Sequence, residues 1–302
     1  GQNTLVHSVD DDGRQQTWET RYVIDASGRD TFLARKFNCK QKNSRHQSAA
    51  LFGHFAKVTR RSGKDEGNIS IYWFQHGWFW MIPLRDNIMS VGCVCWPEYL
   101  KTRRTSPAAF LWQTIALCPP VQERMRHAQL INEAGATGNY SYRADHMVGD
   151  GYLLIGDAYA FVDPVFSTGV YFAMNGAVLA AEAVDAYLHE PAQAKPLLAQ
   201  FDRQVRHGIK VVSWFIYRFT SPAMQALFLA PRNVWRLEEA LISMLAGDVF
   251  RNTPIAARIA LFKFIYGVTW VFQSSRAWAA YRLRRRNVKL LFEGGTTPQD
   301  QC

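Results

Sequence analysis

Residues 151–188 constrain the fold more than any other part of the sequence, because they combine an apolar strand, a short loop and a long helix. The segment reads GYLLIGDAYA, then FVDPVFSTG, then VYFAMNGAVLAAEAVDAYL. The pattern predicts a strand over 144–155, followed by a Gly-Asp pair, a Ser-Thr-Gly turn and a helix over 169–188. The first turn of such a helix offers N–H groups and a positive dipole end to an anion or an electron-rich ring.

Asp157 and the start of the helix are the two candidate binding elements of this segment. A carboxylate at the end of a strand can accept hydrogen bonds from the hydroxyl groups of a sugar or a ribityl chain. Ser167 or Thr168 is the expected N-cap of the helix. The alternative is an ordinary strand–loop–helix connection. We favour a binding role because Gly-Asp, Asp-Pro and Ser-Thr-Gly all fall within residues 156–169.

Residues 46–100 predict an antiparallel sheet, because short β-rich segments follow one another at roughly ten-residue spacing. The expected strands are 48–57, 69–75, 78–83 and 88–94. The third strand contains Trp78 and Trp80 in the stretch HGWFWMIP. By composition alone, two alternating tryptophans are more typical of sheet packing than of catalysis.

These two segments together resemble the flavin-dependent halogenases. Residues 156–169 are similar to the second flavin-binding motif of the glutathione-reductase-type FAD enzymes, and FVDPVFSTGVYFA is similar to its halogenase form. The family signature W-x-W-x-I-P is complete at Trp78, Trp80, Ile82 and Pro83. The resemblance extends over most of residues 16–190, and it implies membership among the tryptophan-halogenase-like FAD oxidoreductases.

The resemblance implies chemistry that uses FAD, a halide ion and O2. Reduced FAD, supplied by a separate flavin reductase, reacts with O2 to give a flavin hydroperoxide. Chloride or bromide attacks this species to give hypohalous acid, which halogenates an aromatic substrate in a separate pocket. The implied enzyme is an FAD-dependent halogenase.

The resemblance also assigns roles to residues of this chain. The expected cofactor-binding residues are Asp25, Gly28, Gly156, Asp157, Pro164, Gly169 and Val170. Asp157 would hold the ribityl or pyrophosphate side of FAD. The expected halide-binding groups are backbone N–H groups at Ser167, Thr168 and Gly169. The expected catalytic wall between flavin and substrate consists of Trp78, Trp80, Ile82 and Pro83. For Asp25 and Gly28, in VIDASGR, a purely structural turn is the equal alternative.

Two departures from the family pattern qualify these assignments. The tryptophan-specific members carry a Glu before the Ser-Thr of the loop, whereas this chain has Phe166. The Val-Phe-Ser form is similar to members that act on pyrrole or phenol groups, often tethered to a carrier protein. No three glycines of the chain match G-x-G-x-x-G, and Lys36 and Lys57 lack the context of the family's catalytic lysine. We therefore expect a chain that lacks the first nucleotide-binding segment and binds FAD weakly by itself.

The charge distribution and the cysteine content narrow the kinds of partner and of site that the chain is expected to have. Residues 201–302 hold 15 Lys and Arg against 6 Asp and Glu, so nearly all of the net charge of +10 lies in the last third. The basic residues match no nucleic-acid-binding signature, and no nucleic-acid partner is expected. The scattered cysteines, Cys39, Cys93, Cys95, Cys118 and Cys302, predict reduced thiols in a cytoplasmic protein and no metal site.

The C-terminal third is expected to be helical, with breaks at Pro222, Pro231 and Pro254. Residues 255–272 are apolar, but Arg258 and Lys263 interrupt them, so a spanning helix is not expected. We favour a packed helix with a solvated basic end. The alternative is a helix that lies on a membrane surface, with its contact extending through the basic segment 276–289.

The predicted fold is α+β or α/β: a partial glutathione-reductase-type FAD-binding fold with an antiparallel substrate sheet and a C-terminal helical region. The expected parts are residues 1–40, the end of the FAD-binding part; 41–145, the β-rich substrate side; 146–190, the second FAD-binding part; and 191–302, the basic helical region. Two alternatives remain open. One is an FAD monooxygenase or dehydrogenase of the same fold, and the other is an inactive remnant that acts as a binding module.

Overall fold

The computed structural model describes residues 3–43, 47–138, 140–229, 233–250, 254–275, 278, 279 and 282. The chain forms two compact units. Unit 1 comprises Gly1–His46, Ser141–Arg218 and Pro231–Lys263, and unit 2 comprises Gln47–Tyr140, Phe219–Ala230 and Phe264–Cys302. The helical region expected over 191–302 therefore contributes to both units.

The strand that leads into Gly156 lies in a small sheet of unit 1. β13 (Tyr152–Leu154) pairs in parallel with β3 (Val23–Asp25) and antiparallel with β12 (Val148–Gly149). The prediction of one strand over 144–155 is wrong, because turns divide it. β11 (Tyr142–Ala144) pairs instead with β4 (Lys40–Lys42) and β14 (Ala160–Phe161).

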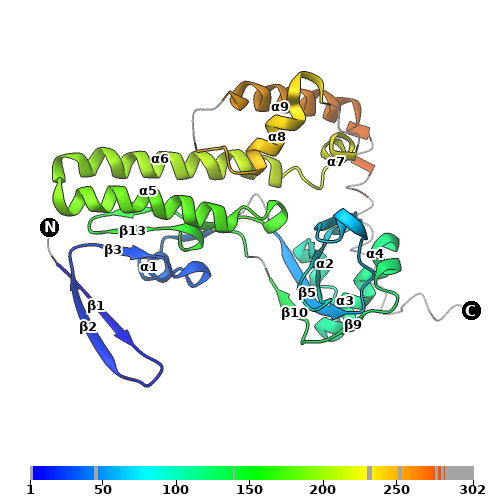
Figure 1. Ribbon diagram of the computed structural model, residues 1–302, viewed down its shortest axis with the longest axis horizontal. Helices are drawn as coiled ribbons and strands as arrows, with labels where there is room; N and C mark the ends of the chain where they lie inside the picture. The colour runs from blue at the N-terminus through cyan, green and yellow to red at the C-terminus, as the bar shows by residue number, and fades with distance from the viewer. Residues whose placement is uncertain are drawn as a thin grey trace, which may run out of the picture. The chain divides into compact units, whose positions relative to one another are not determined.

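The long helix after the loop is confirmed as α5 (Gly169–His189), and α6 (Pro191–Ile216) returns alongside it (Figure 1). Small residues on α5, such as Ala180 and Ala183, are fully buried, which allows close approach of the two helices. The core of unit 1 joins these helices to the ends of β11 and β13 through Leu153, Leu154 and Phe201.

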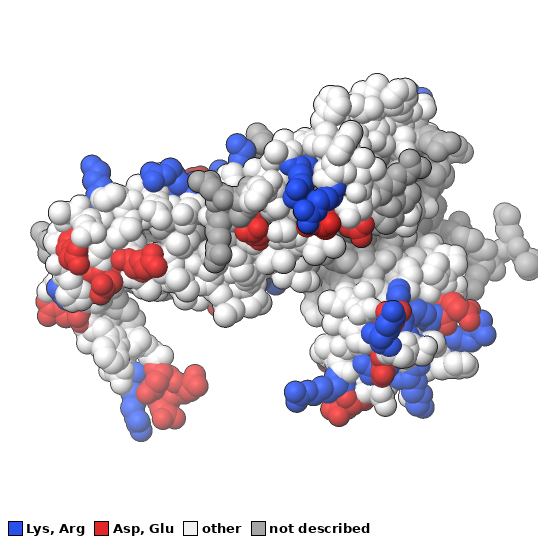
Figure 2. Space-filling view, turned by 45° about the horizontal axis from the view of Figure 1, so that its top comes forward, with Lys and Arg blue, Asp and Glu red and all other residues white. Residues whose placement is uncertain are grey.

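The N-terminal segment of unit 1 forms a two-stranded hairpin that ends before β3. β1 (Thr4–Val9) and β2 (Gln15–Thr20) pair antiparallel, and the chain bends before β3 enters a different sheet. Figure 2 shows charged side chains gathered at the hairpin tip, at the lower left, where Arg14 lies 3.8 Å from Asp12. The short helix α1 (Phe32–Lys36) follows β3.

Unit 2 is built on an antiparallel sheet, and all four strands predicted in this region are confirmed. The strand order is β10–β5–β8–β7–β6, and β9 also pairs with β5. The bounds are β5 Ala49–Ala56, β6 Ser70–Phe74, β7 Gly77–Pro83, β8 Met89–Cys95, β9 Gln129–Leu130 and β10 Gly135–Thr137.

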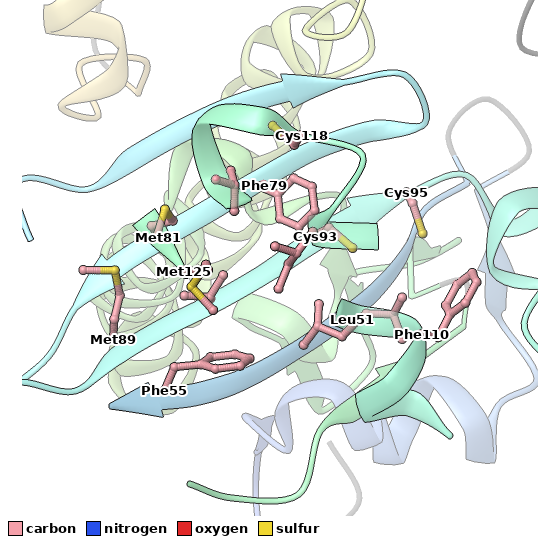
Figure 3. Close-up of a cluster of buried hydrophobic side chains, with 14 of the residues drawn as sticks. Leu51, Phe55, Phe79, Met81, Met89, Cys93, Cys95, Phe110, Cys118 and Met125 are labelled. Carbon is pink, nitrogen blue, oxygen red and sulfur yellow. The ribbon is translucent and has the colours of Figure 1, made fainter. Parts of the chain in front are cut away.

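One face of this sheet packs against helices to form the core of unit 2 (Figure 3). Phe79 and Met81 of β7 point into it, together with Phe55 of β5. The covering helices are α3 (Pro107–Ile115) and α4 (Pro119–Arg124). The Ser106 side chain caps α3 by accepting a hydrogen bond from the N–H of Ala109, at 3.2 Å. Because side chains alternate along a strand, Trp80, which lies between Phe79 and Met81, faces the other side of the sheet.

The remaining helices are α2 (Pro97–Leu100), α7 (Pro222–Leu229), α8 (Leu237–Leu245) and α9 (Ile255–Phe272). Among the described residues, α9 is the one helix whose length and composition would suffice to cross a membrane, and 11% of it is buried. Ile259, Phe262 and Tyr266 pack inward, but most of the helix surface is exposed. The basic segment 276–289 lies largely outside the described residues.

Candidate functional site

The strand pair β3–β13 brings together two turns that lie about 130 residues apart in the sequence. Leu154 is in register with Asp25, and the N–H of Ile155 donates a hydrogen bond to the Asp25 carbonyl at 3.0 Å. Parallel strands end at the same edge, so the turn after each strand lies there. The predicted cofactor residues Asp25, Gly28, Gly156 and Asp157 therefore share one edge of the sheet.

Gly156 occupies a position that only glycine fills without strain. Its φ is +54°, in the left-handed region. An added Cβ would stand 2.9 Å from the Cβ of Ala173 and 3.3 Å from its Cα. Glycine thus allows the first turns of α5 to pack directly on the end of β13.

The Asp25 carboxylate organises its own turn. One oxygen accepts a hydrogen bond from the N–H of Ser27 at 2.9 Å, and the other accepts one from the N–H of Leu33 at 2.7 Å. The residue is 5% exposed. Gly28 follows with φ +62°. These contacts support the structural interpretation of Asp25, and its direct contact with a cofactor stays a prediction.

Asp157 lies in the η3 turn (Gly156–Ala158), half-buried at the same edge. Burial raises the pKa of its carboxyl group, and the positive charge of Arg29 opposes that rise. The Tyr142 hydroxyl donates a hydrogen bond of 2.7 Å to the Asp157 carbonyl and so holds the turn from behind. A half-buried carboxylate in this setting can accept hydrogen bonds from ligand hydroxyl groups.

Arg29 and Lys40 are residues that the sequence reasoning missed. Arg29 lies 5.8 Å from the Phe161 ring centroid. The Lys40 ammonium donates a hydrogen bond to the Thr31 hydroxyl at 2.9 Å and lies 3.8 Å from the Tyr142 ring centroid. Burial and the neighbouring Arg35 and Arg29 charges lower the pKa of Lys40. The sequence feature that could have identified Arg29 is its position directly after Gly28, in the turn VIDASGR.

The loop before α5 is held by its own polar groups. The Asp163 carboxylate accepts a hydrogen bond from the N–H of Val165 at 3.2 Å, which starts the η4 turn (Pro164–Phe166). Ser167 then adopts φ +53°, and its N–H donates to the Pro164 carbonyl at 2.9 Å. Thr168 is the N-cap residue, but the predicted side-chain cap is wrong: no hydrogen bond runs from the helix to the side chain of Thr168. Its φ of −82° and ψ of −7° are helical, not the extended geometry of a capping residue.

A cavity of about 340 Å3 lies against this loop within unit 1. Its lining includes Asp157, the loop residues Asp163, Pro164, Ser167 and Thr168, and Gly169 and Val170 at the start of α5. Apolar residues of α6, including Phe201 and Val212, form another part. Added Cβ atoms at Gly169 and Gly176 would meet open space. Every candidate from residues 156–170 is therefore gathered at one cavity.

The tryptophan motif lies on β7 of unit 2, and its residues Trp78, Trp80 and Ile82 lie on the face opposite the core. Trp78 is buried and Trp80 is half-buried, with their ring centroids 6.0 Å apart. Trp78 also contacts Phe219, at 6.1 Å between centroids. Ile82 and Pro83 end the strand, paired with Ser90 and Met89. The role of these four residues as a wall beside a flavin stays a prediction.

Trp80 is fixed by two neighbours on β8. Its indole N–H donates a hydrogen bond to the Ser90 hydroxyl at 3.1 Å. A Cβ added at Gly92 would stand 2.4 Å from the Trp80 ring, so the ring lies against the glycine backbone. Phe52 borders it at 6.3 Å between centroids. The result is an aromatic surface of defined orientation.

Solved structures share this architecture. A flavin-dependent brominase, Bmp2, superposes with a TM-score of 0.75 at 25% identity, over 88% of this chain and 70% of that chain. A flavoprotein/dehydrogenase from Cytophaga hutchinsonii superposes with a TM-score of 0.78 at 25% identity, over 90% of this chain and 67% of that chain. The fold and the site thus define an α+β flavoprotein of the FAD-binding class, as the sequence predicted.

The sequence profile of the tryptophan halogenase family matches residues 2–232. The chain therefore belongs to the tryptophan halogenase family of FAD-dependent oxidoreductases. It is 26% identical to a 1H-pyrrole-2-carbonyl-[peptidyl-carrier protein] chlorinase of Pseudomonas fluorescens, over 77% of this chain and 53% of the relative. It is 35% identical to the corresponding brominase of Pseudoalteromonas luteoviolacea, over 59% of this chain and 45% of the relative. The chain spans about half the length of these curated relatives.

Proposed function

We propose that the complete protein is an FAD-dependent halogenase that acts on a pyrrole or phenol ring tethered to a carrier protein. The observation that carries the proposal is the gathering of the Gly156–Val170 residues at one cavity, in a chain whose unit 2 carries the complete W-x-W-x-I-P strand. The pyrrole chlorinase and brominase named above supply the substrate class.

The residues at the cavity fit a flavin cofactor. The cavity combines a half-buried carboxylate, that of Asp157, with the N-terminal end of α5 and with apolar walls. Gly169 leaves open space where a side chain would project. A flat ring with a hydroxylated chain needs these three features: a polar acceptor, a positive dipole end and apolar surface.

Each residue of the site would make a specific contribution. The Asp157 carboxylate would accept hydrogen bonds from the ribityl hydroxyls, and the Arg29 charge would keep that carboxylate ionised against its burial. The dipole of α5 would favour the electron-rich edge of the ring system. Bound FAD, once reduced by a separate flavin reductase, supplies the chemistry by which O2 oxidises a halide to hypohalous acid.

The start of α5 is the proposed halide site. N–H groups of the first turn have no partner inside the helix, and the side chain of Thr168 does not occupy them. Ser167, in its left-handed conformation, turns the chain sharply at this point. Chloride or bromide would bind to the N–H groups of Thr168 and Gly169, as anions do at helix N-termini. The N–H of Ser167, which the sequence also predicted as a halide donor, is already bonded to the Pro164 carbonyl.

The substrate side is proposed from two features of the chain. Phe166 stands where the tryptophan-specific members carry a Glu, which favours a pyrrole or phenol ring over an indole. On unit 2, the half-buried Trp80 offers flat apolar surface of the kind on which an aromatic ring stacks, and the buried Trp78 lies beside it. A tethered pyrrole or phenol is consistent with both features.

The test is a halogenation assay of the complete gene product with a flavin reductase and bromide. The substrates are the same pyrrole-2-carbonyl group on a carrier protein and as a free acid. We expect brominated product from the tethered group and little from the free acid. Equal turnover of both would contradict carrier recognition, and activity on free tryptophan alone would contradict the assigned substrate class.

A second candidate is a flavoprotein dehydrogenase or monooxygenase of the same fold. The superposition with the Cytophaga hutchinsonii flavoprotein/dehydrogenase favours it, because that match has the higher of the two TM-scores. This candidate predicts substrate oxidation at an unchanged rate when halide is omitted. We also propose a cytoplasmic location, supported by the unpaired thiols of Cys39, Cys93, Cys95 and Cys118.

A further inference from the structure

The outward face of α9 is apolar along its whole length. Phe264, Val268 and Val271 are 69%, 40% and 63% exposed, and their spacing of four and three residues places them on one side of the helix. Ala257, Ala260 and Gly267 extend the same side and are also exposed. A helix at the surface of a globular protein normally turns its polar side to solvent, whereas α9 turns an apolar side to solvent.

The inward side of the helix is tied to the protein. Phe262 packs on Phe215 at 5.5 Å between ring centroids, and the Tyr266 hydroxyl lies 3.2 Å from the Ser221 hydroxyl. The Lys263 ammonium lies 5.2 Å from the Trp214 ring centroid, away from the exposed face. Such anchoring argues against insertion across a bilayer, because the helix would have to give up these contacts to span one.

The positive charge of the sequence around α9 favours a negatively charged partner. Residues 249–292 hold nine Lys and Arg and no Asp or Glu. Six of these basic residues follow α9, within residues 276–289. Trp270 and Trp278 are exposed at the end of α9 and shortly after it.

We propose that α9 lies in the interface of an anionic membrane surface. Its apolar face would enter the boundary between headgroups and acyl chains, and the basic residues that follow would contact lipid phosphates. Tryptophan at the edge of such a contact suits the headgroup region, where an aromatic ring meets both apolar and polar surroundings. The contact is peripheral, and it does not depend on the halogenase proposal.

The test is sedimentation of the complete protein with vesicles of phosphatidylcholine alone and of phosphatidylcholine mixed with phosphatidylserine. We expect binding to the mixed vesicles that weakens as salt rises. The double variant Phe264→Ser/Val271→Ser should lose most of this binding. Val9→Ser is the matched control, because Val9 is 65% exposed in the N-terminal hairpin. Equal thermal melting of the three proteins shows that any loss is not a folding defect.

A second set of variants tests the charge. Arg284→Gln, Arg285→Gln and Arg286→Gln together should lower the affinity for the mixed vesicles on the order of 100-fold, at about tenfold or less per charge. Equal binding to vesicles with and without phosphatidylserine, or unchanged binding in both sets of variants, would overturn the proposal. Light scattering tests whether a second copy of the chain covers this face instead. A wild-type dimer that does not bind vesicles, and that dissociates in Phe264→Ser/Val271→Ser, would also overturn the membrane proposal.

Discussion

Trp80 lies directly against the backbone of Gly92, so that a Cβ added at Gly92 would stand 2.4 Å from the indole ring. The two residues are paired across strands β7 and β8. The second tryptophan of the W-x-W-x-I-P strand thus owes its orientation to a glycine on the neighbouring strand.

Gly92→Ala is expected to displace Trp80 and to destabilise the protein by about 1–3 kcal/mol through overpacking. Urea unfolding and the tryptophan fluorescence of the native state measure the two effects. Gly67→Ala is the control, because an added Cβ there meets nothing within 4 Å. Equal stability and equal fluorescence of the two variants would contradict the close packing of Trp80 on Gly92.

Gly156→Ala tests the close approach of α5 to the end of β13. The left-handed φ and the contact with Ala173 together are expected to cost about 2–4 kcal/mol of unfolding free energy. Gly63→Ala separates the two causes, since Gly63 has φ +62° and open space around it. We expect Gly156→Ala to be the more destabilised variant. Equal destabilisation of the two variants would show that backbone strain alone accounts for the effect.

Asp157→Asn is expected to remove cofactor binding without lowering the stability of the free protein. Because burial raises the folded-state pKa of Asp157, the folded state binds the proton more tightly than the unfolded state. The unfolding free energy of the wild type therefore falls as the pH rises above about 3.8, through the window that ends at the raised folded-state pKa. Asn removes this fall.

The measurements for Asp157→Asn are denaturant unfolding of the cofactor-free protein across that pH window and flavin absorbance of the complete protein after purification. Since the carboxylate is half-buried, solvent screening keeps the pH effect small. A variant that is less stable than the wild type throughout, with flavin still bound, would assign Asp157 a structural role instead.

Arg29→Gln is expected to raise the pKa of Asp157 further, because the opposing positive charge is lost. The pH window in which the unfolding free energy falls should then extend to higher pH. The same unfolding series measures it. Arg14→Gln is the control, since Arg14 lies on the exposed hairpin beside Asp12. An identical pH profile for Arg29→Gln and the wild type would show that Arg29 does not affect the pKa of Asp157.

The sequence predicts the parts of this site that are local. The strand–loop–helix order around Gly156 and Gly169, and the alternation of Trp78 and Trp80 on a strand, depend on neighbouring residues. Both are found in the structure. The family resemblance follows from the same two segments.

The parts that depend on distant pairing could not be predicted. Arg29 acts on Asp157 only because β3 and β13 are adjacent, and no local pattern specifies that pairing. The absence of a side-chain cap at Thr168 depends on the backbone angles of a tight turn, which residue preferences do not determine. The apolar outward face of α9 likewise depends on which side of the helix the rest of the protein covers.

The proposed activity of the complete protein is the transfer of a halogen, and not of oxygen, with FAD and O2. Its most direct test is the mass of the product formed from a carrier-tethered pyrrole with a flavin reductase, bromide and oxygen-18 gas. Halogen transfer gives a product that carries bromine, contains no oxygen-18 and is not formed when bromide is omitted. A product that carries oxygen-18, formed equally well without bromide, would contradict it.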